Sequence, residues 1–150
     1  MSVTDPISDA ITKIRNACAA EHKTVMVHHS NLVEALVKIL AEENFINSYE
    51  LIDRDTEKKI YRKQIYINLR YTNSGEPVMK NIQRVSRPGL RNYVNANNIP
   101  SVYNNTGCAI ISTNRGVMVD RDARKNNIGG EYICKVWERE ALCQELVNFL

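Results

Sequence analysis

Hydrophobic and polar positions in the first part of the chain alternate with two periods, one typical of helices and one typical of strands. Thr4 or Asp5 can cap a first helix, because both carry a short polar side chain that accepts from helix amides. Pro6 fits the first turn of that helix. The helix then places its apolar side chains at helical spacing: Ile7, Ala10, Ile11, Ile14 and Cys18.

A second helix is predicted directly after Ser30 or Asn31, either of which can serve as its cap. It should end near Asn44. Its apolar side chains are Leu32, Leu36, Ile39 and Leu40.

Three strands are predicted around these helices, at residues 24–28, 45–52 and 60–71. A charged turn at 53–59 joins the last two. In the third strand three apolar residues alternate with polar ones, which indicates one buried face: Ile65, Ile67 and Leu69. Turn-forming residues at 73–77 then predict a linker.

The second part of the chain follows a pattern of short strands, at residues 78–85, 91–95, 108–113 and 130–136. Together the two parts predict an α+β fold, with an N-terminal α-β-α-β-β part and a mainly β C-terminal part. The predicted divisions are an α/β domain at 1–75, a β-rich domain at 76–137 and a short helical tail at 138–150.

Shorter elements are expected between these strands. Residues 95–98 predict a polar turn or short helix, and 120–126 predict a short helix capped by Asp120. Val117 and Met118 form an apolar pair before that helix. The consecutive glycines Gly129 and Gly130 indicate a tight turn into the last strand.

The tail at 138–150 has an apolar stripe, formed by Leu142, Leu146 and Phe149. We expect this stripe to dock on the protein itself or on a neighbour, because an isolated helix of this length is marginal in water. The alternative is a frayed end without a role. If deleting the tail changes neither stability nor assembly, the docking interpretation is wrong.

Composition excludes several classes of protein. Hydrophobic residues make up 43% of 150 residues, which is enough for a core. No apolar run is long enough to span a bilayer and the first residues do not form a signal peptide, so we expect a cytoplasmic protein without membrane contact. The four cysteines lack CxxC spacing, so we expect reduced, mostly buried thiols, with no metal site and no cofactor.

The positive charge of the chain is concentrated in one stretch. The net charge is −1 over residues 1–76, +6 over 77–137 and −2 over 138–150, which sums to +3. Between Glu76 and Asp120 the chain has no acidic residue but five basic ones: Lys80, Arg84, Arg87, Arg91 and Arg115. Such a field attracts phosphates, although a solvated basic face is the alternative.

Two segments of this basic stretch carry candidate binding chemistry. Residues 84–94 place arginines around a Pro-Gly turn, where guanidinium forks match phosphate oxygens and Tyr93 can stack on a base or ribose. Residues 111–116 offer hydroxyl, amide and guanidinium groups, and Gly116 permits close backbone approach. The alternatives are an ordinary basic hairpin and a turn whose hydroxyls bond to its own backbone. Glu131 can order Arg87 or Arg124, or accept from a base amino group.

The segment at 107–124 closely resembles the C-terminal signature of the eighth protein of the small ribosomal subunit. The matching positions are Gly107, Ile110, Ile111, Ser112, Thr113, Gly116, Val117, Met118, Ala123 and Arg124. The resemblance extends over about 3–137, with a nearly identical segment at 84–94. Members often have Lys where this chain has Arg87, and many have Ser at Asn114.

This resemblance implies a primary binder of the central domain of small-subunit ribosomal RNA, with neighbouring ribosomal proteins as further partners. It implies RNA-binding positions at Thr4, Ser30, Arg84, Ser86, Arg87, Arg91, Tyr93, Ser112, Thr113, Asn114, Arg115, Gly116 and Glu131. Members in some bacteria also bind their own messenger RNA, and the chain itself leaves bacterial or organellar origin open. Where the family tends to have a proline and two lysines, this chain departs with His28, Asn31 and Val33.

Functions of other classes have weaker support. An enzyme that used Ser112 or Thr113 as nucleophile would need a base, but the three histidines all lie in the first part: His22, His28 and His29. A protein-interaction module would use the basic face to meet an acidic partner, and a non-ribosomal translational regulator would use it to bind another RNA. Binding to RNA across a salt series distinguishes the protein-interaction module from the ribosomal function.

Overall fold

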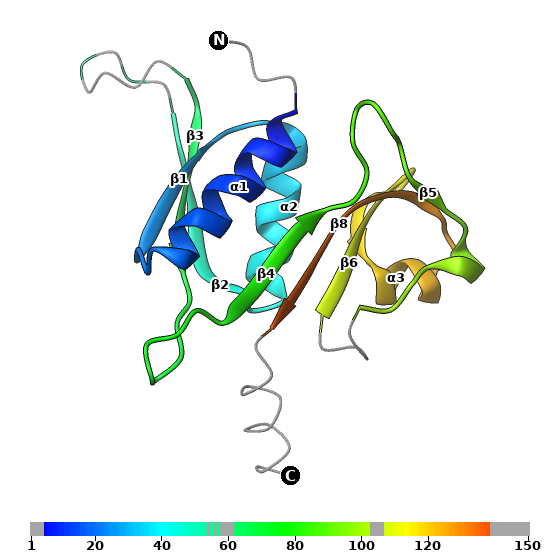
Figure 1. The fold of residues 1–150 in the computed structure, drawn as a ribbon. Coiled ribbons are helices and arrows are strands. Elements are labelled where there is room, and N and C mark those ends of the chain that lie inside the picture. Colours follow the sequence, from blue (N-terminus) through cyan, green and yellow to red (C-terminus); the bar gives the residue numbers. More distant parts are fainter. Residues whose placement is uncertain (1–4, 54, 56, 58–61, 103–106, 139–150) are drawn as a thin grey trace. The chain divides into compact units, whose positions relative to one another are not determined.

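A computed structural model of the chain describes residues 5–53, 55, 57, 62–102 and 107–138 (Figure 1). The chain divides into two compact units, Met1–Pro77 and Val78–Leu150. Thr4, the first two residues of the strand predicted at 60–71, and the tail beyond Glu138 lie outside the described residues.

The first unit begins with helix α1, Pro6–Ala19, in which Pro6 occupies the first turn. Asp5 is the residue before the helix, and its carboxylate accepts a hydrogen bond from the Ser8 hydroxyl instead of capping a helix amide. The face of α1 toward the core buries Ile7, Ala10, Ile11, Ile14 and Ala17, whereas Cys18 is only half-buried.

Helix α2, Asn31–Glu42, is capped by Ser30, one of the two predicted caps, whose hydroxyl accepts from the Val33 amide at 3.2 Å. Its buried face is centred differently from the prediction, on Val33, Leu36, Val37, Ile39 and Leu40. Leu32 is 37% exposed, so its predicted place in the apolar stripe is wrong. Neighbouring residues of a helix point about 100° apart around its axis. Because Val33 is the first residue of the buried stripe, Leu32 lies beside that stripe and not in it.

The sheet of the first unit consists of β1, Thr24–His28, β2, Ile46–Ile52, and β3, Gln64–Leu69, in the order β1-β3-β2. Both pairings are antiparallel. The predicted alternation along β3 is confirmed, because Ile65, Ile67 and Leu69 are all buried. Helix α1 packs against β1 and helix α2 against β2, which gives this unit its core (Figure 1).

The sheet of the second unit has the strand order β4-β8-β6-β7, with β5 also paired to β8. The strands are β4, Met79–Arg84; β5, Tyr93–Val94; β6, Gly107–Thr113; β7, Gly116–Val119; and β8, Gly130–Glu138. A short helix α3, Asp120–Lys125, and a 3-10 turn η1, Ala96–Asn98, join them. The core between sheet and helix contains Ile99, Val102, Ala109, Ile111, Ala123, Tyr132 and Trp137.

Two predictions for this unit need correction. The apolar pair Val117 and Met118 belongs to a strand, β7, which forms a hairpin with β6. Asp120 is not the cap of α3, since Val119 precedes the helix in an extended conformation. Asp120 instead lies in the first turn, is 2% exposed, and places Oδ2 2.6 Å from Nη2 of Arg124 one turn later.

Two of the cysteines in the described part of the chain, Cys108 and Cys134, are buried, as predicted. Burial raises the pKa of the Cys134 thiol to about 12, which outweighs the opposite effect of the Arg84 charge. Cys143 lies outside the described residues. Within the described ranges, no helix is long and apolar enough to cross a bilayer.

Candidate nucleic-acid interface

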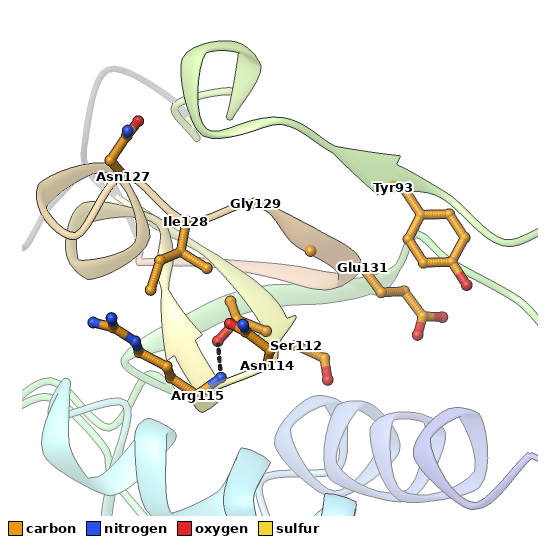
Figure 2. A pocket seen from close by; sticks show the side chains of 10 residues that line it. Tyr93, Ser112, Asn114, Arg115, Asn127, Ile128, Gly129 and Glu131 are labelled. Carbon is orange, nitrogen blue, oxygen red and sulfur yellow. Dashed lines mark hydrogen bonds between the residues drawn. The ribbon is translucent and has the colours of Figure 1, made fainter.

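The hairpin between β6 and β7 presents the polar turn that the sequence singled out. The hydroxyl of Thr113 donates to the carbonyl of Gly116 at 2.7 Å. It accepts from the amide of Arg115 at 3.1 Å, the bond that Figure 2 marks with a dashed line. Gly116 has φ +108°, in the left-handed region that favours glycine. The turn is therefore ordered by its own bonds, and Asn114 and Arg115 extend into solvent from it.

Two glycines bring three strands unusually close beside this turn. A Cβ on Gly130 would lie 2.1 Å from the carbonyl oxygen of Ser112, and one on Gly129 would lie 2.4 Å from that of Val94. These glycines therefore permit close packing of β8 between β6 and β5, where the sequence predicted a tight turn. As a result Glu131 pairs with Ser112 on one side and with Tyr93 on the other.

An open hollow of about 500 Å³ lies where these strands meet. Figure 2 shows Tyr93 and Glu131 at one end of this hollow and Arg115 and Asn127 at the other. Asn127 and Ile128 were not predicted as site residues. The sequence feature that could have indicated them is the pair Asn126 and Asn127 shortly before the two glycines, which is typical of a turn. Asn127 adopts φ +53°, a left-handed conformation that Asn tolerates better than most residues. The hollow is lined by Tyr93, Ser112, Thr113, Asn114, Arg115, Asn127, Ile128, Gly129, Gly130 and Glu131.

The arginine-bearing segment leaves β4 as a loop closed by its own backbone. Arg87 and Leu90 exchange both backbone hydrogen bonds, at 3.1 and 3.0 Å. This turn exposes Arg87, and Leu90 is 77% exposed. Tyr93 is 69% exposed, so its ring is open to solvent and not part of the core. Arg84 differs from its neighbours, because its guanidinium donates to the carbonyl of Ile133 at 2.9 Å within the fold.

Ser86 and Glu131 connect this loop to β8. The Ser86 hydroxyl donates to Oε1 of Glu131 at 2.5 Å, and Nη1 of Arg91 lies 2.9 Å from the same oxygen. Burial alone would raise the pKa of Glu131, but the bonds from Ser86 and Arg91 and the charges of Arg91 and Arg84 together hold that pKa below its usual 4.5. The expectation that Glu131 orders Arg87 or Arg124 is therefore wrong, because the carboxylate lies against Arg91.

The predicted residues thus fall into groups. Tyr93, Glu131 and the turn at 112–115 line one hollow, and Gly116 completes the turn. Ser86 and Arg91 adjoin the hollow through Glu131. Ser30 belongs to the first unit, where it caps α2.

The chemistry of the hollow is hydrogen bonding and stacking. Hydroxyl, amide, guanidinium, phenol and carboxylate groups surround it, whereas residues 78–150 contain no histidine. Among the described residues, no group of three or more His, Cys, Asp and Glu side chains is placed to hold a metal ion. Hydrogen-bond donors and acceptors beside an exposed aromatic ring are suited to binding a polar polymer.

Comparison with known proteins gives one consistent family. The sequence profile described as "Ribosomal protein S8" matches residues 5–137. Similar curated proteins, each described as "Small ribosomal subunit protein uS8", come from Lactobacillus delbrueckii subsp. bulgaricus, with 45% identity over 137 residues, and Anaeromyxobacter sp. strain K, with 47% over 137 residues. Another, from Crocosphaera subtropica, has 42% identity over 138 residues. Each alignment covers 91% of this chain and 100% of the relative.

The described structure has the α+β fold predicted from the sequence. A profile match over most of the chain, together with relatives at this identity, shows that the chain belongs to the ribosomal protein S8 family.

Proposed function

We propose that this protein binds the central domain of small-subunit ribosomal RNA through the hollow between β5, β6 and β8 and through the adjacent arginine loop. Membership of the family makes the chain a structural constituent of the small ribosomal subunit that binds ribosomal RNA, and not an enzyme. The choice of the central domain and of the contact residues is our proposal.

The observation that carries the proposal is the placement of the polar turn beside an exposed aromatic ring. Ser112, Asn114 and Arg115 line the hollow from the hairpin, and Tyr93 lines it from a separate strand. Hydroxyl and amide groups bind base edges and 2′-hydroxyls, while an exposed ring stacks on an unpaired base. The hollow therefore suits an irregular RNA helix with unpaired bases better than a regular duplex.

Electrostatics supports the same surface. Residues 77–137 carry nine basic and three acidic side chains. Asp120 lies against Arg124 and Glu131 against Arg91, so two of the three acids already adjoin a cation. Arg87 on its loop and Arg115 on the hairpin extend outward, where they can neutralise phosphates.

The test is to map the contact surface by nuclear magnetic resonance on the intact chain. The isolated central-domain helix is added to the labelled protein, with an unrelated RNA duplex of equal length as the control. We expect amide shifts at 112–116 and 86–93 with the central-domain helix and much smaller ones with the control. Shifts confined to Met1–Pro77, or equal with both RNAs, would overturn the proposed site.

Further partners follow from the same surface and from the ribosome itself. Neighbouring ribosomal proteins are partners of any subunit constituent. We propose that the protein works in the cytoplasmic ribosome of a bacterium, because its curated relatives come from bacteria. We also propose that a messenger RNA segment that copies the central-domain helix competes for the hollow. Competition between the protein's own messenger RNA and the ribosomal helix tests this.

A further inference from the structure

The polar network at the base of the arginine loop, formed by Ser86, Glu131 and Arg91, begins at a fully buried side chain. Ser86 is 0% exposed, and the Glu131 side chain is 20% exposed. By contrast, the loop residues that follow Ser86 all lie at the surface. A fully buried hydroxyl cannot reach a ligand in solvent, so Ser86 must act through the residues it touches.

The bonds of Ser86 close the loop on itself. Its hydroxyl accepts from the Asn92 amide at 3.1 Å and donates to Oε1 of Glu131 at 2.5 Å. The carbonyl of Asn92 accepts in turn from the amide of Tyr132 on β8, at 2.8 Å. Both backbone groups of Asn92 are thereby held, and Asn92 directly precedes Tyr93.

Glu131 extends this network to an arginine. The same oxygen that accepts from Ser86 lies 2.9 Å from Nη1 of Arg91, whose side chain remains 49% exposed. A continuous path of hydrogen bonds therefore runs from Asn92 through Ser86 and Glu131 to Arg91. Bonded groups in such a path polarise and orient one another.

We propose that Ser86 and Glu131 are positioning residues, which hold Arg91 and Tyr93 in the conformation that binds RNA. Ser86 and Glu131 do not contact the RNA themselves. The proposal rests on the RNA-binding function proposed above and deepens it, because it assigns specificity to groups beneath the surface. Because the loop is already ordered in the free protein, binding does not require the loss of conformational entropy that ordering a flexible loop would cost.

An opposing explanation makes a different prediction. If the only effect of Glu131 is to reduce the positive electrostatic potential of this surface, removing its charge should strengthen binding to every RNA. The positioning role instead requires that the same change weakens binding to the specific RNA alone. Glu131→Gln suits the test, because the amide oxygen still accepts from Ser86 while the charge facing Arg91 is lost.

The experiment measures affinity for the central-domain helix and for an unrelated duplex, using the full chain. The variants are Glu131→Gln, Ser86→Ala, Arg91→Ala and the pair Glu131→Gln with Arg91→Ala. Asp122→Asn is the matched control, because it removes one exposed negative charge in the same unit. Hydrogen exchange of the Asn92 amide in the free protein reports whether each variant has released the loop.

We expect both variants to weaken binding to the specific helix by about five- to tenfold, because Ser86→Ala removes a hydrogen bond of the network and Glu131→Gln removes the charge that faces Arg91. Binding to the unrelated duplex should stay unchanged or tighten slightly, as for Asp122→Asn. The effect of Glu131→Gln should vanish when Arg91 is already Ala, because a residue that acts through another shows a coupled loss. Protection of Asn92 should fall in Ser86→Ala and persist in the control.

Two results would overturn the inference. Equal losses from Glu131→Gln with and without Arg91 would mean that Glu131 contacts the RNA directly. Equal tightening for both RNAs would mean that Glu131 only reduces the local charge. Failure of the proposed function is distinguishable, because it appears in the native chain as the absence of any preference for the central-domain helix.

Discussion

At the scale of single residues, the hollow depends on the absence of a side chain at Gly130. A Cβ there would lie 2.1 Å from the backbone oxygen of Ser112, which cannot move without displacing β6. We expect Gly130→Ala to lower the free energy of unfolding by about 1–3 kcal/mol, as for other overpacked sites, and to weaken RNA binding. Urea unfolding of the variant measures the first effect.

Gly89→Ala is the control for this substitution. A Cβ on Gly89 meets no atom within 4 Å, so we expect its stability to stay within about 0.5 kcal/mol of the native value. Similar losses for both variants would show that the close approach at Gly130 is not what makes glycine necessary there.

Glu131 gives a pH-dependent prediction at the same scale. Its pKa is held below the ordinary 4.5, so the ionised carboxylate stabilises the fold above pH 4.5, and this stabilisation is lost as the pH falls through the lower folded-state pKa. The difference in unfolding free energy between the native chain and Glu131→Gln should therefore be larger at pH 7 than at pH 3. Urea unfolding at both values checks this, and an equal difference at the two pH values would contradict it.

The main polar residues of the hollow can be predicted from one sequence motif, but the pairing that brings them beside Tyr93 cannot. Ser112 and Thr113 follow from the pattern of a strand that ends in a polar turn. Their closeness to Tyr93 depends on the register of β8 with two other strands, which no local pattern encodes. Asn127 could not be predicted for the same reason, because it lines the hollow only through its place just before the start of β8 at Gly130.

At the scale of elements, the start of α2 provides a direct test of local capping. The Ser30 hydroxyl accepts from the Val33 amide, which would otherwise lack a partner inside the helix. We expect Ser30→Ala to cost about 1 kcal/mol of stability. The measurement is thermal and urea unfolding, with the exposed neighbour Asn31 changed to Ala as the control.

A loss from Ser30→Ala no larger than from Asn31→Ala would show that the hydroxyl does not stabilise the helix. Ser30 is also one of the RNA-binding positions that the family resemblance implies, so binding of the same variant to the central-domain helix separates its two roles. Unchanged binding with reduced stability would leave Ser30 with the capping role alone.

Elements with a clear period were predicted well, and short ones were not. The alternation in β3 and the spacing in α1 each extend over several residues, so they outweigh local noise. Strand β7 has only four residues and is defined by its pairing with β6. Asp120 was misassigned as a cap because β7 continues to Val119, leaving no separate polar residue at the boundary.

At the scale of the whole molecule, the two units differ in net charge. Met1–Pro77 carries −1, whereas Val78–Leu150 carries +4, which is the sum of +6 over residues 78–137 and −2 over 138–150. The sequence alone therefore indicated which unit should meet phosphates. It could not indicate that Arg84 and Arg124 bond to backbone carbonyls of their own unit, because those contacts arise only in the folded sheet.

The tail at 138–150 is also a question for the whole molecule. Its amphipathic pattern predicts docking, and all but its first residue lies outside the described part of the chain. We expect a chain that ends at Glu138, where β8 ends, to show reduced stability or reduced incorporation into small subunits. Unfolding and reconstitution measurements that match the native chain would contradict this.

The central claim is that the hollow and the arginine loop recognise the central-domain RNA helix, and a salt series tests it most directly. If about four phosphates are neutralised, log K for the native chain should fall with log salt at a slope of roughly −3 to −4. Arg87→Ala should make the slope shallower by about 1, while Ser112→Ala should leave the slope unchanged and reduce the preference for this helix. The control is Arg62→Ala, an exposed arginine of the other unit. Weak binding that is equal for every RNA and indifferent to Arg87→Ala and Ser112→Ala would contradict the claim.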